Sequence, residues 1–201
     1  MATYMKTISV IGLEGFPLVK TGDDLAKIIV ELAEEEGVPI RDGDIVAVSQ
    51  KIVSKAEGRI IRLRDVKPSR RAEEVAKTTQ KDPRFVELVL REAKRIVKAS
   101  SDTLIVENKK GVTYINAGID KSNVSDEDSY ALLPLNPDQS AKKIRSKIMK
   151  LTGRKVAVII CDTCSRPLRR GQVEFAIGVA GINPFKDYRG QEDLFGYVLK
   201  V

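Results

Sequence analysis

Apolar residues recur along the chain at two spacings, which predict strands and helices in irregular alternation. β-branched runs indicate strands, and apolar residues three or four positions apart indicate one face of a helix. The expected elements are, in chain order, a strand at Thr7–Leu13, a helix at Leu25–Ala33, a strand at Ile45–Val48, helices at Pro68–Thr79 and Asp82–Val97, a hairpin of Leu104–Val106 with Val112–Ile115, a helix at Ser140–Leu151 and a strand at Val156–Cys161. Several strands are placed to pair as hairpins, so the pattern predicts an α+β, or mixed α/β, fold.

Capping and turn residues support several of these boundaries. Asp82 followed by Pro83 is a typical helix start, and Asp24 is placed to cap the first helix. Gly153 is placed to end the helix before the last predicted strand. The remaining chain is rich in Gly, Pro and aromatic residues, and within it we expect only a strand at Tyr197–Val201.

The composition is that of a globular protein. With 201 residues the chain can form one large domain or two small interlocked ones, and its 42% of apolar residues are spread evenly. The longest uninterrupted apolar run, Val156–Cys161, is far shorter than a membrane span. Met1–Thr7 lacks the apolar core of a signal peptide, and two cysteines cannot build a disulfide framework. These features predict a cytoplasmic protein.

The absence of histidine narrows the chemistry. Imidazole cannot be the general base, and a metal site must use carboxylate, carbonyl and hydroxyl oxygens, which suit Mg²⁺ or Mn²⁺ better than zinc. The 35 Lys and Arg residues against 28 Asp and Glu residues give a formal charge of +7, which suits a nucleotide or a nucleic acid. A charged fraction of 31% with few aromatic residues is also typical of thermophilic proteins.

Four polar stretches interrupt the apolar pattern close to predicted strands, and loops at strand ends are favoured binding positions. They are Leu13–Pro17, Ser49–Arg59, Asn116–Asn123 and Cys161–Gln172. Each could also be an ordinary solvated turn, because Gly, Asn and Asp are frequent in turns. The third stretch is not a P-loop, since it lacks a glycine next to its lysine.

The fourth stretch carries the most distinctive chemistry. Asp162 and Thr163 leave the end of an apolar strand, where a carboxylate and a hydroxyl could hold a divalent ion. Arg166 and Arg169 follow, and guanidinium groups bind phosphate oxygens bidentately, so we expect both to contact phosphate during catalysis. A Cys-x-x-Cys spacing begins at Cys161, but this cysteine ends a strand instead of opening a helix, so a redox function is disfavoured.

Taken together, the four stretches resemble one family, the GTP-dependent γ-glutamyl ligases that extend the glutamate tail of coenzyme F-420. The motifs that carry the resemblance are Asp162-Thr163 through Arg169-Arg170-Gly171, Ala176–Gly181, Asp187–Gly190, Ser54–Arg59 and Asn116–Asp120. The similarity extends from Leu13 to about Leu199, and such a set of ordered matches is far more specific than any single one.

The resemblance implies two interlocked subdomains within one ligase domain over residues 1–201, and an intertwined homodimer. It also implies GTP as a substrate, Mg²⁺ or Mn²⁺ at the active site, and K⁺ as a further candidate ion. Carried over by position, the nucleotide contacts are Glu14, Gly15, Phe16, Pro17, Gln50, Lys51, Lys55 and Asn123. Asp120 and Asp162 would share one divalent ion, Thr163 would help to hold a second, and Asp162 is also expected to be catalytic.

The implied reaction joins L-glutamate to the deazaflavin precursor of coenzyme F-420. A carboxylate of the precursor attacks the γ-phosphate of GTP, and the amine of glutamate then displaces phosphate from the acyl phosphate. Phosphoryl transfer needs charge neutralisation and alignment more than proton transfer, so a site without histidine is no obstacle. Family members continue for several dozen residues beyond the position of Val201. We therefore expect this chain to fold and dimerise but to bind GTP more weakly than a longer relative.

Two alternatives stay open at this point. A related ligase could use the same nucleotide chemistry on another carboxylate, and nothing in the sequence identifies the acceptor. The positive charge also suggests a nucleic-acid-binding module. However, aromatic residues make up only 5% and no RNA-binding signature is present, so nucleic acid is the disfavoured partner.

Overall fold

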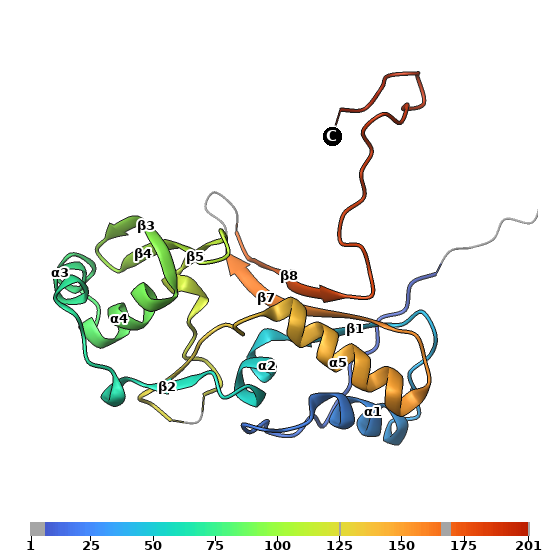
Figure 1. Ribbon diagram of the computed structural model, residues 1–201, viewed down its shortest axis with the longest axis horizontal. Coiled ribbons are helices and arrows are strands. Elements are labelled where there is room, and N and C mark those ends of the chain that lie inside the picture. The colour runs from blue at the N-terminus through green and yellow to red at the C-terminus, as the bar shows by residue number, and fades with distance from the viewer. Residues whose placement is uncertain (1–6, 125, 166–169, 201) are drawn as a thin grey trace, which may run out of the picture.

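The computed structural model describes residues 7–124, 126–165 and 170–200, and only the main chain of Ser165. The predicted α+β class is confirmed (Figure 1). The helices are α1 (Leu25–Glu35), α2 (Gln50–Ala56), α3 (Arg70–Thr79), α4 (Pro83–Glu92) and α5 (Pro137–Thr152), with short 3-10 turns η1 (Leu63–Asp65) and η2 (Asn116–Gly118). The strands are β1 (Ile45–Ser49), β2 (Ile60–Arg62), β3 (Ala93–Ser100), β4 (Thr103–Asn108), β5 (Thr113–Ile115), β6 (Ser129–Ala131), β7 (Ala157–Ser165) and β8 (Gln172–Ala180). None of the helices in these ranges is long and apolar enough to cross a membrane.

Three small sheets contain the strands. In the first sheet, β7 lies between β1, to which it is parallel, and β8, to which it is antiparallel. β2 pairs with β6, and β3, β4 and β5 form an antiparallel sheet. The parallel register places Ser49 opposite Cys161. The residues that follow these two positions therefore start from the same edge of the sheet.

The first hydrophobic core packs α1 and α5 against the sheet of β1, β7 and β8. Val158 and Ile160 of β7 and Ile148 of α5 have no exposed surface. Burying one such side chain stabilises the fold by about 1.5–3 kcal/mol. The predicted apolar face of α1 is buried here, and the Asp24 carboxylate caps this helix, as expected from the sequence.

The second hydrophobic core lies between α3, α4 and the sheet of β3, β4 and β5. Val86 of α4 and Leu104 and Val106 of β4 are fully buried. The Asp82 carboxylate accepts a hydrogen bond from the main-chain N–H of Arg84 at 2.8 Å, which caps α4. Figure 1 shows the elements of the two cores in opposite halves of the molecule, with β2 between them.

One predicted element is wrong, and a second is confirmed only in its first part. The expected strand at Thr7–Leu13 pairs with no other strand in the described chain, and Ile8 and Val10 are 91% and 92% exposed. The predicted helix through Val97 ends at Glu92, because Ala93–Ser100 pairs with β4 as a strand. In both places a tertiary factor, the absence or presence of a partner strand, overrides the local pattern.

Three further differences concern two of the polar stretches and the end of the chain. The expected loop after Ser49 is helix α2, because the Ser49 hydroxyl accepts a hydrogen bond from the N–H of Lys51 at 3.4 Å and caps it. The strand expected to end at Cys161 continues to Ser165, because it pairs along its length with β8, which was not expected. The expected strand at Tyr197–Val201 has only an isolated bridge at Val198, and Val201 lies outside the described residues.

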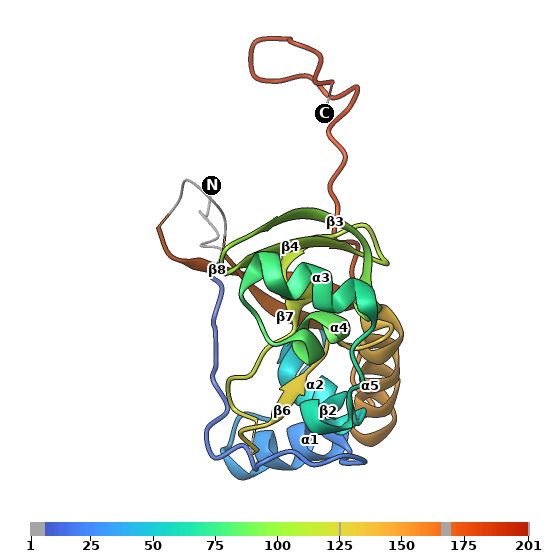
Figure 2. The ribbon, with the colours of Figure 1, turned by 90° about the vertical axis from the view of Figure 1, so that its left-hand side faces the viewer.

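The C-terminal segment, residues 182–200, extends away from both cores (Figures 1 and 2). Its apolar side chains are largely exposed, with Leu194 at 98% and Phe195 at 95%. The N-terminal segment shares this property at Ile8 and Val10. Apolar side chains at both ends of the described chain therefore contribute little to either core.

Gly178 allows β8 to approach the start of α5. A Cβ atom at this position would lie 2.4 Å from the carbonyl carbon of Pro137 and 2.5 Å from its oxygen. We expect Gly178→Ala to lower the free energy of unfolding by about 1–3 kcal/mol, because main-chain atoms must move to relieve the overlap. Urea denaturation followed by circular dichroism measures this loss. Gly12→Ala, whose Cβ would meet nothing within 4 Å, is the control. Equal midpoints for both variants would show that α5 moves aside at no cost.

Candidate functional site

A groove of about 1250 Å³ lies between the first sheet and the segment that follows β5. Its lining comes from the end of β1 and the start of α2, from β5 through Asn123, and from β7 and β8. Six predicted site residues line it: Gln50, Lys51, Asp120, Asn123, Asp162 and Thr163. The groove therefore brings together side chains from three of the four polar stretches.

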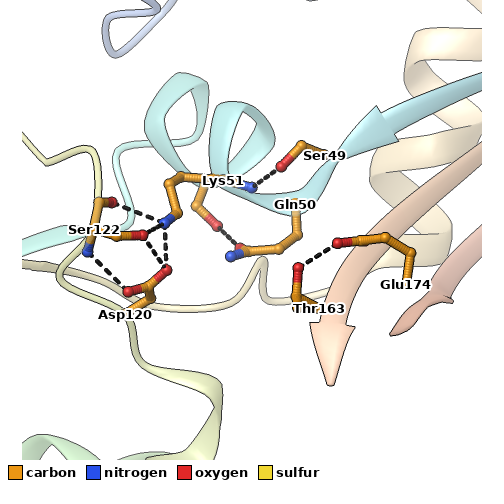
Figure 3. A network of polar contacts seen from close by, with 8 residues as sticks. Ser49, Gln50, Lys51, Asp120, Ser122, Thr163 and Glu174 are labelled. Carbon is orange, nitrogen blue, oxygen red and sulfur yellow. Dashed lines mark hydrogen bonds and ion pairs between the residues drawn. The ribbon is translucent and has the colours of Figure 1, made fainter. Parts of the chain in front are cut away.

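The junction of β1 and α2 places two of these side chains. Ser49 ends the strand and caps the helix, so Gln50 and Lys51 occupy the first helical turn. Gln50 is only 4% exposed, and its side-chain oxygen accepts a hydrogen bond from the Ser54 hydroxyl at 3.0 Å. This bond fixes the orientation of a buried amide at the groove. Lys51, in contrast, reaches across to the segment after β5 (Figure 3).

Lys51 and Asp120 form an ion pair at one side of the groove (Figure 3). The Lys51 ammonium also donates to the carbonyl oxygen of Ser122 at 2.8 Å and to the Ser122 hydroxyl. The Asp120 carboxylate accepts hydrogen bonds from the N–H and from the hydroxyl of Ser122, each at 2.8 Å. Partial burial acts to raise the pKa of Asp120, but the bonds from Lys51 and Ser122 outweigh it and lower this pKa. Asp120 is therefore ionised at neutral pH.

Asp162 has the opposite electrostatic environment. Burial raises the pKa of Asp162 to about 6. The negative charges of Glu174 and Asp120 also raise this pKa. The hydrogen bond from the N–H of Thr163 and the positive charge of Lys51 lower it, but by less. The ionised carboxylate is thus poorly compensated in the ligand-free protein. A cation beside Asp162 would favour the ionised form.

Thr163 contacts a carboxylate that the sequence analysis did not single out. It is paired with Glu174 of β8, and its hydroxyl donates a hydrogen bond to the Glu174 carboxylate (Figure 3). In the described ranges, no three Asp, Glu or Cys side chains converge tightly enough to form a ready-made metal site. The donors are nevertheless carboxylate and hydroxyl oxygens, which is the ligand type that Mg²⁺ and Mn²⁺ prefer.

The other predicted site residues that the structure describes do not line the groove. Glu14–Pro17 is exposed except for Phe16, which packs against the first core. Lys55 lies in the last turn of α2 and is not among the lining residues. Arg166 and Arg169 fall outside the described residues, so their phosphate contacts stay predictions.

Cys161 and Cys164 both line the groove, and no disulfide joins them. They lie three positions apart along one strand, so their Cα atoms are about 10 Å apart, which exceeds the Cα separation of about 7 Å that a disulfide tolerates. Burial, with the charge of Glu174, raises the pKa of the Cys161 thiol. A raised pKa is the opposite of what a reactive thiolate requires. The geometry therefore agrees with the sequence in disfavouring a redox pair.

Among the groove residues without an assigned role in the sequence analysis are Ser122, Glu174 and Tyr114. Ser122 follows Asp120 by two positions, which is the spacing of an Asx turn. Apolar residues alternate with other residues through Gln172–Ala180, which would have predicted a strand bearing Glu174. Tyr114 gave no local signal, because its contact with Phe175 exists only in the folded chain.

Comparisons with known proteins agree with the motifs. A family model described as F420-0:Gamma-glutamyl ligase matches residues 15–201. The chain is 47% identical over 194 residues to the coenzyme F420:L-glutamate ligase of Methanothermobacter thermautotrophicus, covering 96% of this chain and 77% of that protein. It is 46% identical over 194 residues to the Archaeoglobus fulgidus protein of the same name, covering 96% and 75%. It is 44% identical over 203 residues to the Methanocaldococcus jannaschii one, covering 100% and 78%.

We expect Asp162→Asn to stabilise the metal-free protein at alkaline pH. A carboxyl whose pKa rises from 3.8 to about 6 on folding binds more protons in the folded state between these values. Its contribution to stability is present at lower pH and is lost as pH rises through this window. The amide of the Asp162→Asn variant carries no charge at any of these pH values, so the variant does not lose this stability. In EDTA, the melting temperature of the variant should exceed that of the wild type at about pH 8, and the difference should shrink near pH 4.

Asp120→Asn is the matched comparison for this experiment. The pKa of Asp120 is lowered, so its carboxylate stabilises the folded state above the unfolded pKa. This variant should therefore melt below the wild type at about pH 8. If Asp162→Asn also melted below the wild type there, the charge of the Asp162 carboxylate would be well compensated in the folded protein, and the inference of a poorly compensated charge would be wrong.

Proposed function

Because the chain belongs to the F420-0:gamma-glutamyl ligase family, we propose that it joins L-glutamate to the deazaflavin precursor of coenzyme F-420 in a GTP-dependent reaction. Support for an amide ligase acting on this coenzyme comes from relatives whose name states that activity. The single observation that carries the proposal furthest is the groove. There Lys51, Asp120 and Asp162 meet, although they lie far apart in the sequence.

The proposed reaction has two steps. A carboxylate oxygen of the acceptor attacks the γ-phosphorus of GTP, a new P–O bond forms, and GDP leaves with the electron pair of the broken bond. The α-amine of glutamate then attacks the acyl carbon of the acyl phosphate. An amide bond forms, phosphate leaves, and the proton of the amine passes to solvent. Repeated addition would make γ-linked glutamates.

The charges of the groove are suited to these steps. The Lys51 ammonium would contact phosphate oxygens, with Gln50 and Asn123 also lining the nucleotide site. Asp120, Asp162 and Thr163 would hold Mg²⁺ or Mn²⁺, which when bound neutralises phosphate charge during the transfer. K⁺ is retained as a further candidate ion. The raised pKa of Asp162 supports this assignment, because a carboxylate short of compensation gains most from a cation.

The remaining predicted contacts belong to the same proposal. Arg166 and Arg169 would bind phosphate during catalysis, since guanidinium groups match phosphate oxygens bidentately. Glu14–Pro17 and Lys55 would contact the nucleotide, although neither lines the groove of a single chain. A second subunit could bring them to it. This is one reason to propose that the active form is a homodimer. A cytoplasmic location is part of the same proposal.

The exposed apolar side chains at the two ends of the described chain are the second reason to propose a homodimer. Ile8, Val10, Leu194 and Phe195 are each more than 90% exposed. Single exposed apolar residues are ordinary, but runs of them on extended segments favour a partner surface. We propose that the C-terminal segment, residues 182–200, packs on a second copy of the chain.

Glutamate incorporation tests the proposed activity. Wild-type protein with GTP, Mn²⁺ and the deazaflavin precursor should attach radiolabelled glutamate and release phosphate. Asp120→Asn should reduce turnover about 100-fold or more, because the variant would hold less tightly the divalent ion that neutralises phosphate charge. Asp65→Asn, an exposed carboxylate outside the groove, is the control and should keep full activity. Turnover with another acid but none with the precursor would identify a related ligase with a different acceptor.

Sedimentation tests the proposed dimer. Leu194→Ser combined with Phe195→Ser should weaken self-association at least about tenfold, because two fully exposed apolar side chains lose their burial at the interface. The melting temperature at low protein concentration should stay unchanged, since neither side chain belongs to a core. An unchanged dissociation constant would place the interface elsewhere.

A further inference from the structure

A second cavity, of about 230 Å³, adjoins the groove. It lies between the turn that joins β4 to β5, the segment Leu133–Pro137 and the middle of β8. Val112, Tyr114 and Phe175 line both this cavity and the groove. The two spaces therefore share a wall, and none of the predicted nucleotide or metal residues lines the second one.

The walls of this cavity are apolar and partly aromatic. The rings of Tyr114 and Phe175 lie 6.1 Å apart at 32°. Leu133, Pro134 and Leu135 line another side, and Leu135 is 69% exposed. Aromatic and aliphatic walls of this kind suit a flat ring, because offset stacking and apolar contact add to each other.

Two lysines carry positive charge at the same cavity. Lys109 and Lys110 line it from the β4–β5 turn. This turn is held in place because the Asn108 side-chain oxygen accepts hydrogen bonds from the N–H groups of Lys110 at 2.9 Å and Val112 at 3.0 Å. The ammonium groups are thus attached to a well-defined turn.

Nearby acids do not neutralise these two lysines. Glu92, which also lines the cavity, is paired with Arg59 at 3.0 Å. Glu107 is paired with Lys94 at 3.2 Å and with Arg95 at 2.7 Å. Among the described residues, Lys109 and Lys110 consequently have no carboxylate partner. An apolar cavity with two uncompensated cations is suited to a ring that carries an anionic substituent.

We propose that this second cavity binds the ring of the carboxylate acceptor, with Lys109 and Lys110 holding an anionic group on the chain between that ring and the reacting carboxylate. The proposal rests on the proposed ligase function and assigns a place to its acceptor. A volume of about 230 Å³ is below the range of about 300–1,000 Å³ for complete ligand pockets, so the cavity takes only part of the acceptor. The rest passes Tyr114 and Phe175 into the groove, where its carboxylate meets the phosphate.

Direct binding tests the proposal separately from turnover. The fluorescence of the deazaflavin precursor is titrated with protein, without GTP or glutamate. Lys109→Ala combined with Lys110→Ala should weaken this binding about tenfold, since two partly solvated charge contacts are lost. In the ligation assay the same variant should raise KM for the precursor about tenfold and leave kcat and KM for GTP unchanged.

Two controls make the test specific. Lys142→Ala combined with Lys143→Ala removes the same charge from exposed positions of α5 that line neither cavity, and should bind like the wild type. A deazaflavin ring without its anionic chain should bind the wild type and the Lys109/Lys110 variant equally. Equal binding of the whole precursor to both proteins, or no binding to the wild type, would overturn the acceptor cavity. If the precursor binds the wild type more tightly than the Lys109/Lys110 variant but no glutamate is transferred, the acceptor cavity is upheld and the ligase function is refuted.

Discussion

Strand β7 connects the interior of the protein to its groove, and the position of the site depends on its pairing. Its first half supplies Val158 and Ile160 to the first core, where neither side chain is exposed. Its second half carries Asp162 and Thr163 beside β8. β1 pairs with β7 as far as Cys161, and β8 pairs with both halves of the strand, so the packing of the core determines where the oxygen donors begin and β8 holds them beyond it. The stability of the core and the geometry of the groove are therefore linked through one strand.

Elements that depend on local interactions were predictable from the sequence. Asp82 with Pro83 marked the start of α4, and Gly153 marked the end of α5, because caps act on neighbouring main-chain groups. Two segments whose conformation is decided by the presence or absence of a partner strand were not. Ala93–Ser100 continues the helical spacing of α4 but becomes a strand through pairing with β4. Thr7–Leu13 is the converse, since its β-branched residues have no partner strand within the described chain.

The same distinction applies to the site. The types of side chain needed for phosphate and metal chemistry could be selected from the sequence, and six of them line one groove. Their partners could not, because Lys51 and Asp120 are 69 residues apart and meet only after folding. Glu174 was missed for a related reason, since its role depends on the antiparallel register that places it opposite Thr163. The aromatic wall of Tyr114 and Phe175 likewise joins β5 to β8.

Lys51 couples the two acids of the groove. Its ammonium pairs with Asp120, where it lowers the pKa, and it also counters the raised pKa of Asp162. A divalent ion shared by the two carboxylates in the proposed reaction would compete with Lys51 for Asp120, because both cations use the same oxygen atoms. The displaced lysine has a flexible stem and three donors, so it can turn to a phosphate oxygen. The ion and the nucleotide would then favour each other's binding. The ion would free the Lys51 ammonium to contact a phosphate oxygen, and the phosphate would compensate the positive charge of that displaced ammonium.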